Sequence, residues 1–332
     1  MSARAAPRCA AANATLSREH AAQRLCVRGR LMPTLFVIGS LKTGTTSLWS
    51  QLVDNTDGHI TPGALTDKGD VSRKEKDFFG DPTMYRRGGA FYERIWPRCS
   101  SDAKPTVAID ATPAYHVWHN APSNMFSFFG AHTPRLRLVW MLRDPVAKFW
   151  SYFWELKAYG GSWDSVRFAD WVAPKVARTR ECLAARSDSP LWPPSLPPPF
   201  QSCAPHLDHG LYEPQLRRWL QFFKPSQFLL VSFAGYARHP GAVVRDVLLH
   251  AGLPPRAAAA AAGRVRSAKK GMRNSKAVGH GRMPVRWQNA LHALYDPFVD
   301  RLYRLIEQHR IMVTPCEHQH SRFLDSPNAT RS

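Results

Sequence analysis

The sequence lacks any uninterrupted apolar run of the roughly 20 residues that a membrane-crossing helix needs. It also lacks the compact apolar core of a secretory signal, because its beginning is rich in alanine and arginine and Glu19 is the only acid there. We therefore expect residues 1–32 to be a disordered leader or the remnant of a targeting segment. Membrane association is expected only through a segment that is not evident in this chain.

Paired cysteine motifs are absent as well. Six cysteines are spread along the chain, none of them in a Cys-x-x-Cys pair, and no zinc-ligand spacing occurs. The pattern excludes a disulfide scaffold, and we expect no metal site. Cys182 and Cys203 flank a proline-rich stretch at 193–199. Their spacing fits a bridge that clamps this stretch and fits two unpaired buried thiols equally well.

Acidic residues are scarce relative to basic ones. The 332 residues include 45 Lys and Arg but only 25 Asp and Glu, which gives a formal net charge of +20 at pH 7. A charge of this size attracts nucleic acid, anionic membrane or acidic polysaccharide. Because no motif that reads DNA or RNA accompanies the charge, we expect no nucleic-acid partner.

What the sequence does contain is an alternation of short apolar runs and helical patterns. The run at 136–142 is apolar on both faces, as is typical of a buried parallel strand. The expected strands are 34–38, 106–109, 136–142 and 228–233, and the expected helices are 45–53, 146–157, 212–223, 242–251 and 284–310. We predict one α/β domain at 33–312, with a P-loop-like three-layer fold of a central parallel sheet flanked by helices, and a flexible tail at 313–332.

Residues 36–49, FVIGSLKTGTTSLW, join an expected strand to a helix through a glycine turn. The backbone N–H groups of such a turn and of the helix N-terminus bind anions. The side chains that add a cation or hydroxyl donors are those of Lys42, Thr45, Thr46 and Ser47. A nucleoside-triphosphate loop would have its lysine directly after the second glycine, where this chain has Thr45 after Gly44. The motif therefore predicts an anion site of another kind.

A second basic turn, Arg143-Asp144-Pro145, follows the strongest apolar run, and Ser151 lies in the helical stretch after it. A guanidinium fork matches phosphate oxygens, so Arg143 and Ser151 together are a candidate for a second phosphate site. The two motifs thus predict two anion sites at the ends of neighbouring strands.

These two motifs, LFVIGSLKTGTTSLW and VWMLRDPVAKFWSYF, resemble those of the sulfotransferases. The resemblance implies a donor, 3′-phosphoadenosine-5′-phosphosulfate, whose 5′-phosphosulfate binds the first motif and whose 3′-phosphate binds the second, without a metal. The segment Ser275-Lys276 to Gly281-Arg282 resembles a loop that closes over the nucleotide. The donor-binding residues implied are Lys42, Thr43, Gly44, Thr45, Thr46, Ser47, Arg143, Ser151, Lys276, Gly281 and Arg282, and Lys42 is implied to be catalytic as well.

Further segments resemble the Golgi carbohydrate sulfotransferases that modify glycosaminoglycans. The run KEKDFF at 74–79 resembles their Lys-Glu-Pro-His-Phe-Phe segment, which implies that Glu75 is the general base. The run DATPAY at 110–115 resembles their Glu-Lys-Thr-Pro-Ala-Tyr segment, with Ala111 in place of the lysine. This alanine and the Cys182 and Cys203 pair tilt the resemblance toward the chondroitin-type 6-O-sulfotransferase branch. An anionic, glycosaminoglycan-like acceptor and a location in the Golgi lumen are implied.

Two other functions stay open from the sequence alone. A nucleotide kinase-like enzyme would need a magnesium-binding acid at a strand end, which Asp110 offers, but also the lysine that is missing after Gly44. A catalytically degenerate polysaccharide-binding protein would keep the fold without turnover, and Ala111 and the altered base segment are compatible with it.

Overall fold

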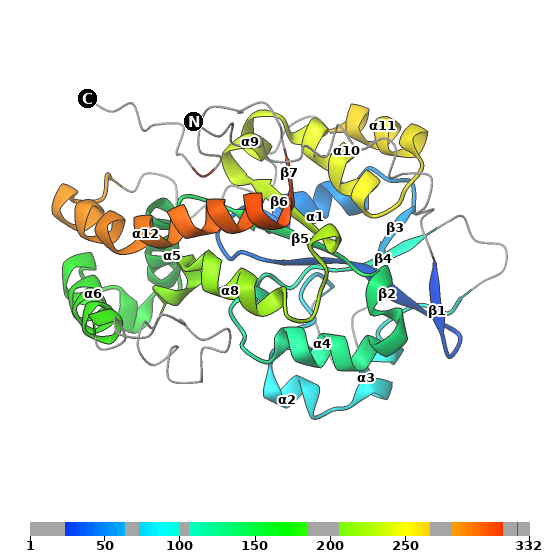
Figure 1. Ribbon diagram of the computed structural model, residues 1–332, viewed down its shortest axis with the longest axis horizontal. Helices are drawn as coiled ribbons and strands as arrows, with labels where there is room; N and C mark the ends of the chain where they lie inside the picture. Colours follow the sequence, from blue (N-terminus) through cyan, green and yellow to red (C-terminus); the bar gives the residue numbers. More distant parts are fainter. Residues whose placement is uncertain are drawn as a thin grey trace.

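The computed structural model describes residues 24–63, 73–99, 106–184, 206–265, 281–314 and 324. Within them a seven-stranded sheet has the spatial order β3-β4-β2-β5-β6-β7, and β1 pairs with β2 (Figure 1). The β1–β2 pair is antiparallel, and all other pairs are parallel. The strands are β1 Leu25–Val27, β2 Arg30–Gly39, β3 Ile60–Pro62, β4 Val107–Asp110, β5 Arg137–Leu142, β6 Phe228–Ser232 and β7 Met312–Thr314.

Helices cover both faces of the sheet, so the fold has three layers (Figure 1). One face is covered by α1, α10 and α11, and the other by α3, α4, α8 and part of α12. The helices are α1 Thr45–Asp54, α2 Pro82–Tyr85, α3 Gly89–Arg94, α4 Ala121–Phe129, α5 Pro145–Ala158, α6 Phe168–Ala184, α8 Tyr212–Trp219, α9 Phe233–Arg238, α10 Pro240–His250, α11 Pro255–Arg264 and α12 Val285–His309.

Strand β2 shows why the sheet needs two covering layers. Leu35 and Val37 point into the cluster under α1 and α10, whereas Phe36 and Ile38 point into the opposite cluster. All four are fully buried. The ring of Phe36 lies 5.7 Å from that of Phe129 on α4, in an edge-to-face arrangement. A strand that is apolar on both faces is typical of a parallel sheet with both faces covered.

The predicted fold class is therefore confirmed. A third apolar cluster, formed by α5, α6 and the first half of α12, lies beyond the end of the sheet. The run of six alanines at 257–262 lies in α11. No described helix is long and apolar enough to span a bilayer.

Three short strands were not predicted. Strand β3 lies outside the expected strands and helices, β1 precedes the predicted boundary at residue 33, and β7 crosses the boundary at 312. Each of them has three residues, which is too short for an alternating pattern to stand out from its surroundings. Their pairing is decided by the strand next to them rather than by their own sequence.

A disulfide that the sequence did not reveal joins Cys26 on β1 to Cys99. The backbone N–H of Cys99 donates to the carbonyl of Gly29 at 2.9 Å, so the segment before residue 100 is also hydrogen-bonded to the turn between β1 and β2. Cys182 is disulfide-bonded as well. Its expected partner, Cys203, lies outside the described residues.

Replacing Cys26 and Cys99 together by alanine is expected to lower the free energy of unfolding by about 4 kcal/mol, because the bridge closes a loop of 73 residues in the unfolded chain. Urea unfolding of both proteins without reductant measures the difference. An unchanged midpoint and slope would show that the bridge does not constrain the unfolded chain.

Candidate active site

Three of the motifs singled out in the sequence meet at one edge of the sheet. Strands β4, β2 and β5 are parallel neighbours, so their carboxyl ends lie side by side. The glycine loop follows β2, and Arg143 follows β5. The segment that contains Glu75 is hydrogen-bonded to the end of β4, since the N–H of Ala111 donates to the carbonyl of Lys74 at 3.2 Å. Ligands of open α/β sheets bind at this edge.

The glycine loop is fastened to β5 by its first residues. The N–H of Ser40 donates to the carbonyl of Met141 at 3.0 Å, and the indole N–H of Trp140 donates to the Ser40 hydroxyl at 2.9 Å. Within the loop, the buried Thr43 hydroxyl donates to the carbonyl of Ser40 at 2.6 Å. The hydroxyl of Thr43 therefore holds the loop in shape, and an anion would meet its backbone N–H rather than its side chain.

The start of α1 is open to an anion. Gly44 is the N-cap residue, no side chain caps the helix, and its first turn contains no acidic residue. The φ angle of Gly44 is 82°, and a Cβ atom there would come within 3.3 Å of the Phe233 ring. Thr46 is exposed, whereas Thr45 is buried. An uncapped helix N-terminus has unsatisfied N–H donors and a partial positive charge.

Ser47 faces away from this opening. Its hydroxyl lies 2.9 Å from the hydroxyl of Tyr236 on α9, in a buried contact. Of the hydroxyls predicted to bind the donor, those of Thr43 and Ser47 thus already have partners within the protein, which leaves those of Thr45 and Thr46 nearest to the open helix end.

Arg143 links the two anion motifs. Its guanidinium donates to the carbonyl of Lys42 at 3.1 Å and lies 4.6 Å from the centre of the Phe233 ring. The neighbouring Asp144 accepts from the N–H of Ala147 at 2.6 Å and so caps α5. Burial lowers the pKa of Arg143, but a guanidinium remains charged in proteins. Within the described segments Arg143 has no carboxylate partner, so its charge is available to a ligand.

Ser151 and Glu155 lie one helical turn apart on α5, and Ser151 is only partly buried. The Lys42 ammonium donates to the Glu155 carboxylate at 3.1 Å. Glu155 was not singled out in the sequence, because it is separated from Lys42 by 113 residues and no local pattern marks it.

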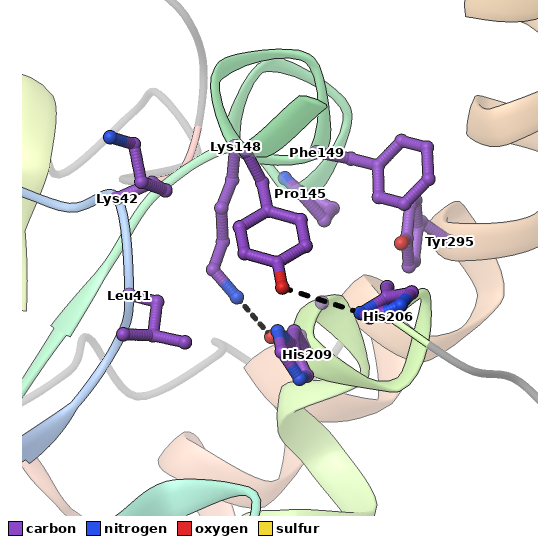
Figure 2. A pocket seen from close by; sticks show the side chains of 10 residues that line it. Leu41, Lys42, Pro145, Lys148, Phe149, His206, His209 and Tyr295 are labelled. Carbon is purple, nitrogen blue, oxygen red and sulfur yellow. Dashed lines mark hydrogen bonds between the residues drawn. The ribbon is translucent and has the colours of Figure 1, made fainter. Parts of the chain in front are cut away.

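A small cavity lies behind the loop lysine (Figure 2). Figure 2 shows the Lys148 side chain extending from α5 to the carbonyl of His209, to which its ammonium donates. The Lys42 ammonium points away from Lys148 and from His209. The cavity is lined by Leu41, Lys42, Pro145, Lys148, Phe149, Tyr152, His206, His209, Gly210 and Tyr295.

Lys148 is a buried lysine that sequence reasoning missed. Burial lowers the pKa of Lys148 to about 7, although the carboxylate of Asp208 attracts its proton. Burial also lowers the pKa of His206 and His209, so both imidazoles are neutral at pH 7. In the sequence, Lys148 stands within an apolar helical run, and nothing distinguishes it from a solvated surface lysine.

The segment that contains Glu75 is held by a buried hydrogen-bond network. The hydroxyl of Thr112 accepts from the N–H groups of Lys76 and Asp77 at 2.9 and 3.3 Å. The same hydroxyl donates to the carboxylate of Asp110 at 2.7 Å. Glu75 itself forms an ion pair with Lys74, and its side chain is 38% exposed. These hydrogen bonds fix the backbone next to Glu75, and the Glu75 carboxylate reaches solvent.

Asp110 is the centre of this network. Besides Thr112, its carboxylate accepts from the hydroxyls of Tyr92 and Tyr115 at 2.8 and 3.0 Å. Burial raises the pKa of Asp110 to about 6, although the three hydroxyls favour the ionised form. Asp110 is fully buried, so it supports the segment and does not touch a ligand.

The departures from the resembled family have visible structural roles. The ammonium of Lys76 donates to the carbonyl of Arg73 at 3.0 Å, and burial lowers its pKa to about 8. Burial, and then the charge of Glu75, raise the pKa of Asp77 to about 6. Ala111 is fully buried in the core under α1. Its side chain supplies no polar contact to the site, and only its backbone N–H does so, by donating to the carbonyl of Lys74.

The predicted nucleotide loop is described only in part. Gly281 and Arg282 are exposed and precede α12, and Lys276 lies outside the described residues. In the segments that the structure describes, no group of three His, Cys, Asp or Glu side chains is placed to hold a metal ion.

Comparisons with known proteins extend the resemblance. No family model matches the chain. It is 25% identical over 224 residues, 68% of its length, to bifunctional heparan sulfate N-deacetylase/N-sulfotransferase 3 of Homo sapiens. It is 24% identical over 225 residues to N-deacetylase/N-sulfotransferase 2 of Bos taurus. The matched regions are 23% and 22% of these relatives, so the chain corresponds to less than a quarter of their length.

The fold has a counterpart among solved structures. A sulfotransferase from Alicyclobacillus acidocaldarius superposes with a TM-score of 0.53 at 22% identity, covering 83% of this chain and 96% of that one. The expected resemblance to carbohydrate sulfotransferases is confirmed by the sequence similarity, and the fold is similar to that of a solved sulfotransferase. The tilt toward a chondroitin-type branch is not confirmed, because these sequence relatives are heparan sulfate enzymes.

Replacing Thr112 by valine should remove the hydrogen bonds that join Asp110 to the segment of Glu75. We expect a loss of about 1–3 kcal/mol in the free energy of unfolding and roughly tenfold faster hydrogen exchange at the amides of Lys76 and Asp77. Thr56→Val is the matched control, because the buried Thr56 hydroxyl also donates to a carbonyl, that of Leu52, and accepts from a backbone N–H. Equal exchange at these two amides in both variants would contradict the positioning role.

Proposed function

We propose that this chain is a sulfotransferase that moves the sulfuryl group of 3′-phosphoadenosine-5′-phosphosulfate to a hydroxyl of an anionic carbohydrate. The observation that carries the proposal is the uncapped N-terminus of α1 beside two cations, Lys42 and Arg143. The position of the Glu75 segment at the end of the adjacent strand supports it. The similarity to heparan sulfate N-sulfotransferases points to the same chemistry.

The residues present fit a donor with two anionic ends. The open N–H groups at Gly44, Thr45 and Thr46 suit the 5′-phosphosulfate, since they combine several donors with a helix dipole. Arg143 and Ser151 suit the 3′-phosphate, because the guanidinium has no carboxylate partner in the described segments. Gly281, Arg282 and Lys276 would close over the nucleotide, as the sequence resemblance implies.

Glu75 and Lys42 have separate roles in the proposed reaction. The Glu75 carboxylate takes the proton of the acceptor hydroxyl as that oxygen forms its bond to sulfur. The bond from sulfur to the 5′-phosphate oxygen breaks at the same time, and adenosine 3′,5′-bisphosphate leaves. The Lys42 ammonium offsets the negative charge that develops on the leaving oxygen. Transfer of this kind depends on alignment and charge more than on covalent help from the protein.

The net charge supports the proposed acceptor, and the disulfides support the proposed location. A net charge of +20 favours an anionic polysaccharide, and the sequence relatives are by name enzymes of heparan sulfate. The Cys26–Cys99 bridge and the bonded Cys182 fit an oxidising compartment. The Golgi lumen, which the resemblance implies, is such a compartment.

The structure weakens the kinase-like alternative. Asp110, the acid that could have held magnesium, is fully buried, and its carboxylate accepts hydrogen bonds from three hydroxyls. Neither of its oxygens is open to a metal-bound phosphate. The degenerate polysaccharide binder has the same fold and charge, so turnover is what separates it from the enzyme.

Calorimetric titration with adenosine 3′,5′-bisphosphate, compared with ATP plus magnesium, tests the proposed function. Tight binding of the bisphosphate and weak binding of ATP are expected, followed by sulfate transfer from the donor to a heparan-type glycan. Preference for magnesium and ATP would overturn the proposal. Binding of the bisphosphate without transfer to any anionic glycan would favour the degenerate binder.

Arg143→Ala should remove the preference for the 3′-phosphate. We expect the ratio of affinities for adenosine 3′,5′-bisphosphate and adenosine 5′-phosphate to fall by about tenfold or more, as charge-assisted hydrogen bonds are lost. Arg137→Ala is a matched control, because Arg137 stands at the opposite end of β5 and also donates to a backbone carbonyl. A ratio that survives in Arg143→Ala would place the 3′-phosphate elsewhere.

Glu75→Gln should abolish turnover and leave bisphosphate binding intact, because the amide cannot take the acceptor proton. We expect turnover to fall by about a hundredfold or more. Glu93→Gln, which removes a carboxylate paired with Arg28 at the other edge of the sheet, should change neither quantity. Loss of nucleotide binding together with turnover in Glu75→Gln would instead indicate a structural glutamate.

A further inference from the structure

We propose that Glu155 is a positioning residue that holds the Lys42 ammonium in the donor-free site and gives it up when the donor binds. The inference rests on the proposed function, because it assigns the donor as the group that takes the lysine from Glu155. It gives the loop lysine two successive partners, a carboxylate from α5 and then an anion at the start of α1.

The contact between Lys42 and Glu155 is sheltered from solvent. Their charged atoms are 3.1 Å apart, and the two side chains are 14% and 28% exposed. A pair of this kind is screened less than one on the open surface. It therefore fixes where the ammonium lies before a ligand arrives.

The backbone of Lys42 is already fixed, so only its side chain can change partner. Its φ angle is 63°, in the left-handed region, and its carbonyl accepts from the Arg143 guanidinium at 3.1 Å. Four rotatable bonds separate the ammonium from this anchored backbone. Lys42 can thus exchange one anion for another without any movement of the loop.

The surrounding charges explain why a carboxylate is needed here. Lys42 and Lys148 line the same cavity, the Arg143 guanidinium donates to the Lys42 carbonyl, and the charge of Arg143 helps to lower the pKa of Lys148. Glu155 is a carboxylate that offsets the charge of Lys42 here. Once a phosphosulfate supplies negative charge, the same carboxylate competes with it for the ammonium.

Glu155 lies on the helix that also carries the proposed 3′-phosphate ligand Ser151, four residues earlier. Residues four apart lie on one face of a helix, so both side chains are directed to the same region. When Lys42 leaves it, the Glu155 carboxylate remains at the edge of the donor site. The free energy needed to separate Lys42 from Glu155 therefore weakens the affinity for the donor.

A double-mutant cycle on bisphosphate binding tests the exchange of partners. The four proteins are the wild type, Lys42→Ala, Glu155→Gln and the double variant, each titrated with adenosine 3′,5′-bisphosphate. We expect Glu155→Gln to tighten binding about three- to tenfold more when Lys42 is present than when it is alanine. Simple repulsion between Glu155 and the ligand would tighten binding equally in both backgrounds.

Two further variants distinguish the positioning of Lys42 by Glu155 from the effect of a change in net charge. Glu93→Gln changes the net charge equally at a distant pair and should leave the affinity unchanged. Glu155→Asp keeps the charge on a shorter side chain. Its affinity for the bisphosphate should lie between that of the wild type and that of Glu155→Gln. Equal effects of Glu155→Gln in both backgrounds would overturn the inference alone, whereas a wild type that binds no bisphosphate would overturn the proposed function and the inference together.

Discussion

The hydrogen bond from the Arg143 guanidinium to the carbonyl of Lys42 is the contact on which the candidate site depends. It joins the ends of β2 and β5, two strands that are neighbours in the sheet but far apart in the sequence. Because it fixes the backbone of the loop, the N-terminus of α1 opens beside two cations. The guanidinium therefore has a structural role in addition to its proposed role in binding a phosphate.

A buried hydrogen-bond network around Asp110 supports the part of the site that contains Glu75. The Asp110 carboxylate accepts hydrogen bonds from the hydroxyls of Tyr92, Thr112 and Tyr115. The Thr112 hydroxyl in turn accepts from the backbone N–H of Lys76, next to Glu75, and so fixes that backbone. Charged groups at the surface of the site are thus supported by neutral hydroxyls below it. Such support matters because a proton acceptor must lie within hydrogen-bond reach of its target.

The features that could be predicted from the sequence are local ones. The glycine loop and the basic turn at Arg143 each place a recognisable pattern within a few residues at the end of an apolar run, and the parallel sheet follows from those runs. The contacts that were missed join distant parts of the chain. Lys42 and Glu155 are 113 residues apart, Lys148 and His209 are 61 apart, and Cys26 and Cys99 are 73 apart. No short pattern encodes such a contact, since only the folded sheet and its helices bring the partners together.

The ring of Phe233, the first residue of α9, lies next to Gly44 and Arg143, which belong to the two proposed anion sites. It limits the space at Gly44, and the guanidinium of Arg143 stacks on its face. A change of size at position 233 would therefore alter the surroundings of Gly44 and of Arg143 together, and with them both ends of the proposed donor site. Because one ring contacts both positions, we expect a substitution at position 233 to affect both ends of the proposed site at once.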